Sequence, residues 1–141
     1  MAKRKSAAKS PMELSLKLLG ELGYTRQKVE HWNPFAGRRQ DLFGVIDIVA
    51  VKSGEVGVLG VQCTTASNVS EHIRKVVESR EANEWLRAGN KLAIHGWDKK
   101  KVKNKWQYTL REERFTTLDK TDVPSQAKFR ERTRATGCKN G

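Results

Sequence analysis

The sequence predicts an α/β domain in which helices flank a mixed central β-sheet. Two observations carry this prediction. Apolar residues recur at helical spacing over 12–22 and again over 69–86, whereas the runs 43–51 and 56–63 between them are almost continuously apolar. Apolar runs this short, bounded by glycine and polar turn residues, are typical of strands that are buried on both faces. The resulting order of helix, three strands, helix and two strands indicates a sheet with both parallel and antiparallel neighbours.

The first helix is expected to begin at Ser10. Serine is a favoured N-cap, Pro11 suits the first helical position, and Glu13 stands where a capping box needs an acid. A first strand follows over Tyr24–Trp32, and residues 33–40, which include Asn, Pro and Gly, are expected to form a loop.

The two apolar runs are expected to pair as a hairpin. A turn closed over Ser53-Gly54 places Asp47 opposite Gly60 and on the same face as Gln62 and Thr64. The diagonal from Asp47 to Gln62 is then about 7–8 Å between Cα atoms, within reach of one bridging cation. A shift of one residue in the turn would move Gln62 to the opposite face.

A second helix is expected over 68–88, since Asn68 is a suitable capping residue and Gly89 suits a helix end. Two further strands are expected at 91–95 and around 106–110. If these strands are antiparallel neighbours, the lysine-rich segment 99–105 lies at the tip of their hairpin.

Positive charge is concentrated at the two ends of the chain. The net charge is +12 and the pI is near 10.0, with a net +6 in residues 1–40, −1 in 41–96 and +7 in 97–141. A field of this sign attracts polyanions and predicts binding to nucleic-acid phosphates, with DNA as the first candidate and RNA as the alternative. A charge run can also be only a solvated loop. The residues predicted to contact nucleic acid are Arg38, Arg39, Arg74, Lys99, Lys100, Lys101, Lys103 and Lys105.

The chain is expected to hold one domain over 10–116, with a basic, disordered N-terminal segment at 1–9 and a flexible basic tail at 117–141. No apolar run approaches the roughly 20 residues of a membrane span, so no membrane partner is predicted. Cys63 and Cys138 have no Cys or His pair beside them, which argues against a zinc site and favours a reducing compartment. We therefore expect a cytoplasmic protein associated with nucleic acid.

Asp47 is the residue that the hydrophobic pattern does not explain. A lone carboxylate in a strand of Val, Ile and Ala is costly to bury unpaired, and such residues usually ligate a metal or meet a strong partner. The alternatives are a salt-bridged core carboxylate for Asp47 and a strand-end hydrogen bond for Gln62. Glu13 is likewise open to a helix-capping role alone. Asp41 is expected to be a loop residue paired with an arginine, and membership of the site is the alternative.

A helix with an early Glu, a strand–turn–strand carrying Asp and Gln-x-Thr, and a following helix together resemble the PD-(D/E)XK nuclease superfamily. The small Holliday-junction resolvases and the Mrr-like nucleases are the most similar branches. The resemblance covers residues 10–97 and implies a restriction-endonuclease-like αβββαβ core. It further implies that Glu13, Asp47 and Gln62 bind Mg²⁺ or Mn²⁺, with Asp47, Gln62 and Thr64 in catalytic positions.

Two positions depart from the pattern of that superfamily. Gln62 replaces the usual acid, which has precedent in the Mrr-like branch, and Thr64 replaces the lysine that orients or helps to activate water. The following helix offers Arg74 and Lys75 as substitutes, and Lys75 is assigned to the catalytic set. The resemblance also implies a homodimer, because resolvases must cut two strands.

The expected function is therefore metal-dependent hydrolysis of DNA phosphodiester bonds, with selectivity for branched DNA. The alternative is a catalytically degenerate nuclease fold that binds DNA or RNA without cutting it, which the missing lysine and the Glu-to-Gln change favour. The histidines are expected to be structural or at the surface and the tryptophans to anchor the core, with base stacking as an alternative for Trp97. These residues are His31, His72, His95, Trp32, Trp85, Trp97 and Trp106.

Overall fold

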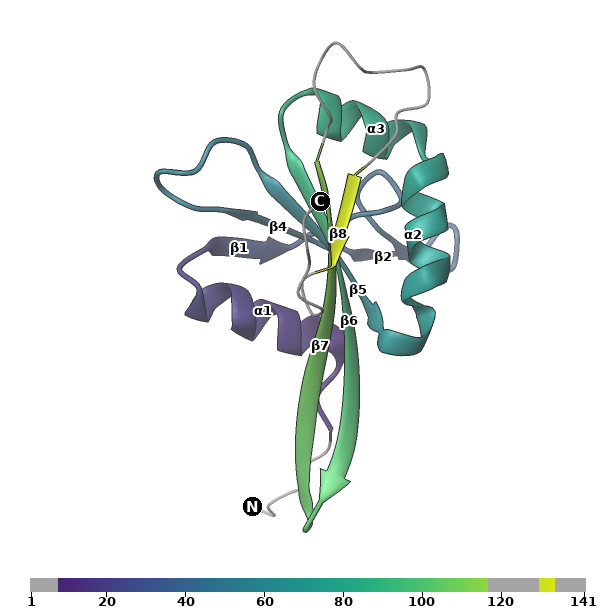
Figure 1. Cartoon of the computed structure of the whole chain (residues 1–141). Coiled ribbons are helices and arrows are strands. Elements are labelled where there is room, and N and C mark those ends of the chain that lie inside the picture. The colour runs from purple at the N-terminus through teal and green to yellow at the C-terminus, as the bar shows by residue number, and fades with distance from the viewer. Residues whose placement is uncertain (1–7, 117–129, 134–141) are drawn as a thin grey trace.

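The computed structural model describes residues 8–116 and 130–133, which form a mixed α/β fold (Figure 1). Within these residues the main sheet has the strand order β1-β4-β5-β6-β7-β8, with β5 and β6 parallel and the other neighbours antiparallel. A separate two-stranded sheet consists of β2 and β3. The expected α/β class with a mixed sheet is confirmed. The elements are α1 (Pro11–Glu21), β1 (Thr25–Lys28), β2 (His31–Asn33), β3 (Arg38–Gln40), β4 (Ile48–Val51), β5 (Leu59–Thr65), η1 (Ala66–Asn68), α2 (Val69–Glu78), α3 (Arg80–Arg87), β6 (Lys91–Val102), β7 (Lys105–Thr116) and β8 (Arg130–Thr133).

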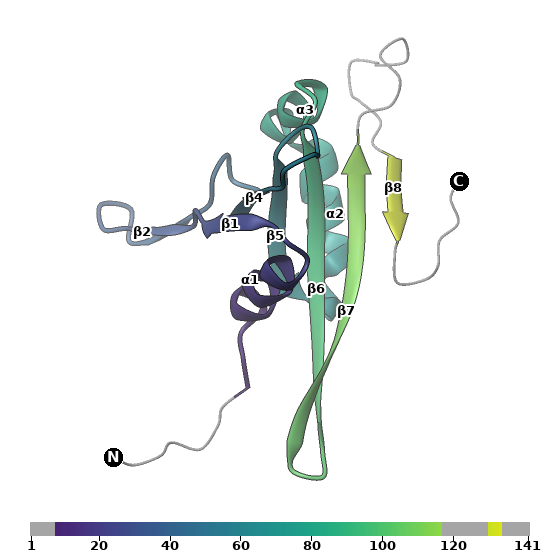
Figure 2. The same cartoon turned by 90° about the vertical axis from the view of Figure 1, so that its left-hand side faces the viewer.

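Helices cover both faces of the main sheet. Helix α1 lies on one face, and α2 and α3 lie on the other (Figures 1 and 2). Leu19 of α1 packs in one buried cluster with Ile48 and Val61 of the sheet. Val76 of α2 packs in a second cluster with Ile94. Successive side chains of a central strand therefore contact different helices.

The segment after α1 differs from the expected strand and loop. The expected strand 24–32 is divided into β1 and β2, and the expected loop 33–40 contains strand β3. The chain leaves the main sheet after Lys28, and β2 and β3 pair with each other as a hairpin. Figure 2 shows this β2–β3 hairpin projecting away from the body of the molecule.

The pairing of β4 with β5 is two residues away from the expected pairing of Asp47 with Gly60. Phe43 has a φ of 56° in a turn, and β4 begins only at Ile48. Ile48 pairs with Val61, because the connection between these strands is longer than a two-residue turn. A slip of two residues does not change the face on which each side chain lies.

The C-terminal half also differs in the extent of its elements. The expected helix 68–88 is divided at Ser79, whose extended backbone ends α2 and whose side chain caps α3. Strands β6 and β7 extend well beyond the expected 91–95 and 106–110 and form an antiparallel hairpin with the lysines near its tip. Its turn at Lys103-Asn104 has positive φ at both residues, as a type I′ turn requires. Figure 1 shows this hairpin extending beyond the helices.

Strand β8 falls within the expected tail 117–141 and pairs with β7. The rest of that tail and residues 1–7 of the expected N-terminal segment lie outside the described residues. Among the helices that the structure describes, none combines the length and apolar character needed to cross a membrane.

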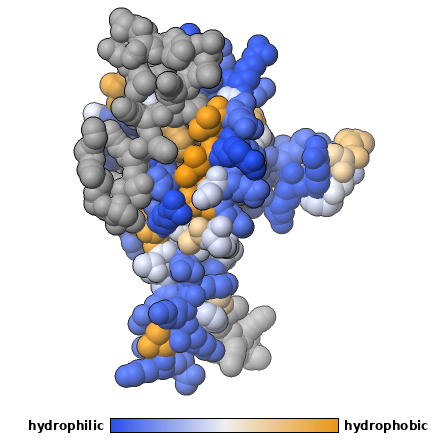
Figure 3. All heavy atoms as spheres, turned by 45° about the vertical axis from the view of Figure 1, so that its right-hand side comes forward, coloured by the Kyte–Doolittle hydropathy of each residue, from blue (hydrophilic) through white to orange (hydrophobic). Residues whose placement is uncertain are grey.

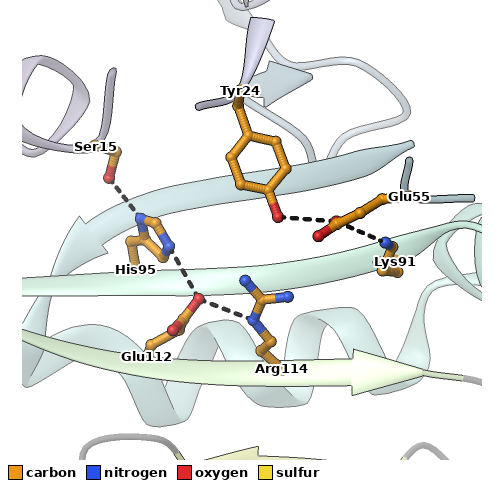
Figure 4. Close-up of polar contacts among 7 residues, drawn as sticks. All are labelled: Ser15, Tyr24, Glu55, Lys91, His95, Glu112 and Arg114. Carbon is orange, nitrogen blue, oxygen red and sulfur yellow. Dashed lines mark hydrogen bonds and ion pairs between the residues drawn. The ribbon is translucent and has the colours of Figure 1, made fainter. Parts of the chain in front are cut away.

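A buried hydrogen-bonded network joins α1 to the centre of the sheet (Figure 4). Ser15 Oγ lies 2.8 Å from His95 Nδ1 and accepts a hydrogen bond of 2.8 Å from Trp97 Nε1. His95 Nε2 lies 3.3 Å from Glu112 Oε2, to which Arg114 Nε donates at 3.0 Å. Burial alone would raise the pKa of Glu112, but the His95 hydrogen bond and the Arg114 charge outweigh it and lower the pKa to about 2. Because Ser15 has no exposed surface, this network positions α1 rather than presenting a nucleophile.

Replacing Ser15 by alanine is expected to lower the free energy of unfolding by about 2–4 kcal/mol, because His95 Nδ1 and the Trp97 indole N–H lose their partner. Urea denaturation followed by circular dichroism measures the change. Ser53→Ala, at an exposed turn position, is the control and should change stability by less than about 0.5 kcal/mol. Equal stability of the two variants would contradict a structural role for the network.

Candidate metal centre and nucleic-acid interface

The β2–β3 hairpin brings two acidic residues together at its base. His31 pairs with Gln40, so Glu30 and Asp41, one position further out, face each other where the hairpin meets the main sheet. Asp47 lies just before β4, and one carboxylate oxygen from each of the three acids lies within 4.8 Å of the other two. Oxygen ligands gathered in this way suit hard divalent cations such as Mg²⁺. We call Glu30, Asp41 and Asp47 the acidic cluster.

Asp47 is fixed where the chain enters β4. Its backbone N–H donates to the Val61 carbonyl at 2.8 Å, and its Oδ2 accepts from the Cys63 N–H at 2.9 Å. The pKa of Asp47 is raised to about 7, and burial is the largest cause of the rise. The charges of Asp41 and Glu30 and a hydrogen bond with Asp41 contribute to the rise, and the Cys63 hydrogen bond opposes it. Its described surroundings are acidic, which does not fit a salt-bridged core carboxylate.

Gln62 and Thr64 flank Cys63, whose amide binds Asp47. Both side chains are buried, with exposed fractions of 1% and 8%. Gln62 Oε1 lies 3.0 Å from His72 Nδ1 of α2, and because an amide oxygen only accepts, the imidazole is the donor. Gln62 is therefore oriented from the face of the sheet that α2 covers, and Thr64, two residues along β5, shares that face.

Lys75 lies three residues after His72 on α2, which places both near one side of that helix. Burial lowers the pKa of His72, and the positive charge of Lys75 lowers it further. The charges of Glu71 and Asp41 act in the opposite direction. His72 is thus within electrostatic range of both Lys75 and Asp41 of the acidic cluster, so α2 supplies an amine near the Gln62–His72 pair.

Glu13 is not brought to the acidic cluster. Its Oε1 accepts from the Ser10 N–H at 2.9 Å and its own N–H donates to Ser10 Oγ at 3.2 Å, which completes a capping box at the start of α1. Helix α1 also lies on the face of the sheet opposite α2 (Figure 1). The capping alternative for Glu13 is confirmed. Glu30 and Asp41 occupy the place beside Asp47 that the sequence assigns to Glu13.

The predicted phosphate-contacting lysines lie on the β6–β7 hairpin, and we call residues 99–105 the basic arm. Lys99 Nζ and Lys101 Nζ lie 5.7 and 5.3 Å from the ring centroid of Trp106, at cation–π distance. Trp106 therefore stands among the lysines instead of anchoring the core. The exposed lysines of the basic arm are Lys99, Lys100, Lys101, Lys103 and Lys105.

The three predicted arginines lie on other elements. Arg38 and Arg39 are exposed on β3, where Arg39 Nη1 lies 3.9 Å from Glu30 Oε2. Arg74 is exposed on α2 and lies 3.9 Å from Glu71 Oε2. The residues predicted to contact nucleic acid therefore lie on three separate elements: the projecting β2–β3 hairpin, α2 and the basic arm.

Sequence reasoning missed Glu30 and His72 as site residues. The loop position expected for Asp41 is confirmed, and its carboxylate lies with Glu30 and Asp47, the alternative that the sequence left open. The signal for the two acids is their equal distance from a turn, which becomes visible only once residues 31–40 are paired as a hairpin. His72 shows no ligand spacing and is revealed by its contact with Gln62. The expectation that Trp32 anchors the core is wrong, because β2 leaves the main sheet and Trp32 is 57% exposed.

None of the family models, curated proteins or solved structures with which this chain was compared matches it.

Proposed function

We propose that this chain is a metal-dependent DNA endonuclease of the PD-(D/E)XK type. The observation that carries the proposal is the acidic cluster at the start of β4, next to the Gln62-x-Thr64 segment of β5. The order of elements supports it, because α1, β1, β4, β5, α2 and β6 follow one another as αβββαβ once the β2–β3 hairpin and the short helices are set aside. The parallel pair β5–β6 is joined through α2, as a parallel pair requires a crossover.

The acidic cluster suits a divalent cation. Its three carboxylates are close enough to hold one ion, and the raised pKa of Asp47 reflects charge repulsion and burial that a cation would relieve. Mg²⁺ or Mn²⁺ bound by Glu30, Asp41 and Asp47 would supply Lewis-acid polarisation of the phosphate and an activated water. Gln62 would support this centre through its amide, which His72 orients.

Lys75 takes the role of the lysine that is missing from β5 in this proposal. Its amine lies near His72 and can stabilise negative charge that develops on the phosphate oxygens. Thr64, which is buried on β5, would fill part of the space of the missing lysine. The exposed lysines of the basic arm and Arg38 and Arg39 of β3 would hold the DNA backbone without reading bases.

The experiment that tests this function is cleavage of end-labelled linear duplex, single-stranded and four-way-junction DNA with Mg²⁺ or Mn²⁺. We expect cleavage that requires the metal and stops when EDTA is added. Binding should weaken steeply with salt, since phosphate contacts release counterions. Intact binding to every substrate without cleavage of any would contradict the proposal.

Lys75→Ala is expected to reduce the rate of cleavage by roughly a hundredfold, because removal of one preorganised charge-stabilising donor has effects of that order. Single-turnover rates at saturating protein measure this step. Lys17→Ala is a matched control. Lys17 is an exposed lysine on α1, so this variant removes the same charge from the face of the sheet opposite α2. Equal rates for the two variants would show that Lys75 has no part in the reaction.

A second candidate function is nucleic-acid binding without cleavage. The observation that favours it is the state of β5, where Thr64 offers no amine and Gln62 Oε1 already accepts from His72. On this reading the basic arm and the projecting hairpin bind the backbone, and the acidic cluster is a remnant. Metal-independent binding combined with inactivity on all three DNA substrates would favour this function over the first.

A further inference from the structure

The β2–β3 hairpin exposes two aromatic side chains, Phe35 in its turn and Trp32 on β2. Phe35 is 97% exposed and Trp32 is 57% exposed, and the hairpin projects from the body in two views (Figures 2 and 3). Figure 3 also shows hydrophobic residues at the end of this projection, separate from the band on the body. Large apolar side chains held in water in this way indicate a contact surface rather than a core.

Hydrogen bonds within the turn hold its tip in one conformation. Asn33 Oδ1 accepts from the N–H groups of Phe35 and Ala36 at 2.9 and 3.1 Å, and its Nδ2 donates to Gln40 Oε1 at 2.9 Å. The Gly37 N–H donates to the Asn33 carbonyl at 2.8 Å, with a positive φ of 66° at Gly37. Phe35 is therefore presented by an ordered turn, so little backbone entropy is lost when it binds.

The charge around these aromatic residues selects the partner. Arg39 pairs across the hairpin with Trp32, and Arg38 pairs with Asn33, so both arginines border the exposed rings. A ring beside cations matches a nucleic acid, whose bases stack on aromatic side chains while its phosphates contact arginine. A base inside an intact duplex has both faces covered, so only an end, a branch or an unpaired nucleotide offers a free face.

We propose that the β2–β3 hairpin is a wedge that stacks Phe35 on an unpaired or terminal base and so selects DNA in which the duplex is interrupted. This selection of substrate rests on the proposed nuclease function, whereas the binding preference does not. Glu30, at the base of the hairpin, is four residues from the turn, about 13 Å along an extended strand. The DNA backbone between the stacked base and the acidic cluster would therefore span about four nucleotides, at roughly 3.4 Å each.

Binding without cleavage tests the wedge directly. The full chain and its Phe35→Ala variant are titrated in EDTA with fluorescent DNA of one sequence, as intact hairpin-capped duplex or as a fork. A 2-aminopurine base at the branch reports stacking. We expect Phe35→Ala to lose about tenfold in affinity for the fork and nothing for the capped duplex. Val56→Ala, which removes another side chain that is 86% exposed, is the control and should match the parent protein.

Two results would overturn the wedge. One is an unchanged affinity of Phe35→Ala for the fork with an unchanged 2-aminopurine signal. The other is a change of oligomeric state in sedimentation without any change in DNA binding, which would make the hairpin a protein contact. Because the titration needs no metal, failure of the wedge is distinct from failure to cleave. With Mn²⁺ added, a cleaving protein should cut within about four nucleotides of the branch.

Discussion

Asp47→Asn is expected to reduce metal-dependent DNA cleavage by more than a hundredfold. Residues that only orient metal ligands change activity by about 10–100-fold, so the loss of a carboxylate from the acidic cluster itself should have a larger effect. The amide keeps the shape of Asp47 and can still accept from the Cys63 N–H. The fold should therefore persist, and the loss should appear in the rate of cleavage and not in DNA affinity.

Single-turnover cleavage in Mn²⁺, with DNA binding measured in parallel, provides this comparison. Glu84→Gln is the matched control, because Glu84 is an exposed acid on α3 outside the acidic cluster. We expect the control to cleave at the parent rate. If Asp47→Asn also cleaved at that rate, Asp47 could not be a ligand of a catalytic metal.

The stability of the metal-free protein is expected to fall as pH rises from about 4 to 7. The pKa of Asp47 is about 7 in the folded chain against an ordinary value of 3.8, so the folded state retains a proton that the unfolded state releases. The stabilising effect of this retained proton is complete below the unfolded pKa of 3.8 and is lost as pH rises through the folded pKa of about 7. The difference corresponds to about 4 kcal/mol at 1.36 kcal/mol per pKa unit.

Comparison with Asp47→Asn isolates this effect from other titrating groups. The asparagine variant imitates the protonated acid at every pH, so it should match the parent protein near pH 4 and exceed its stability at pH 8. Urea denaturation in EDTA measures both free energies of unfolding. A difference between the two proteins that does not depend on pH would show that Asp47 is ionised in the folded protein throughout this range.

The class of fold could be predicted because its signals are local. The capping box of α1 and the apolar runs of the central strands identify a helix and a buried hairpin from neighbouring residues alone. The break at Ser79 and the length of β6 and β7 could not be predicted. Polar residues such as Lys100 continue a strand there because it pairs with a neighbour across a hairpin, not because its side chains are buried.

The candidate site could be predicted in part. Asp47 stands out as a carboxylate in an apolar run, and the register slip of two residues moves it along β5 without changing its face. Glu30 and Asp41 could not be assigned, because they approach Asp47 only through the β2–β3 hairpin, whose short strands are exposed and lack alternating hydrophobicity. Hydrophobic periodicity therefore cannot identify site residues that border a hairpin of this kind.

The measurement that tests the central claim most directly is calorimetric titration of the metal-free protein and Asp47→Asn with Mn²⁺. We predict one saturable site in the parent protein and none in the variant, since the acidic cluster loses a charged ligand. Titrations in buffers of different ionisation enthalpy should show release of about half a proton per ion at pH 7, because Asp47 is then half protonated. Equal Mn²⁺ binding by both proteins, or none by the parent at pH 8, would contradict a metal centre at Asp47.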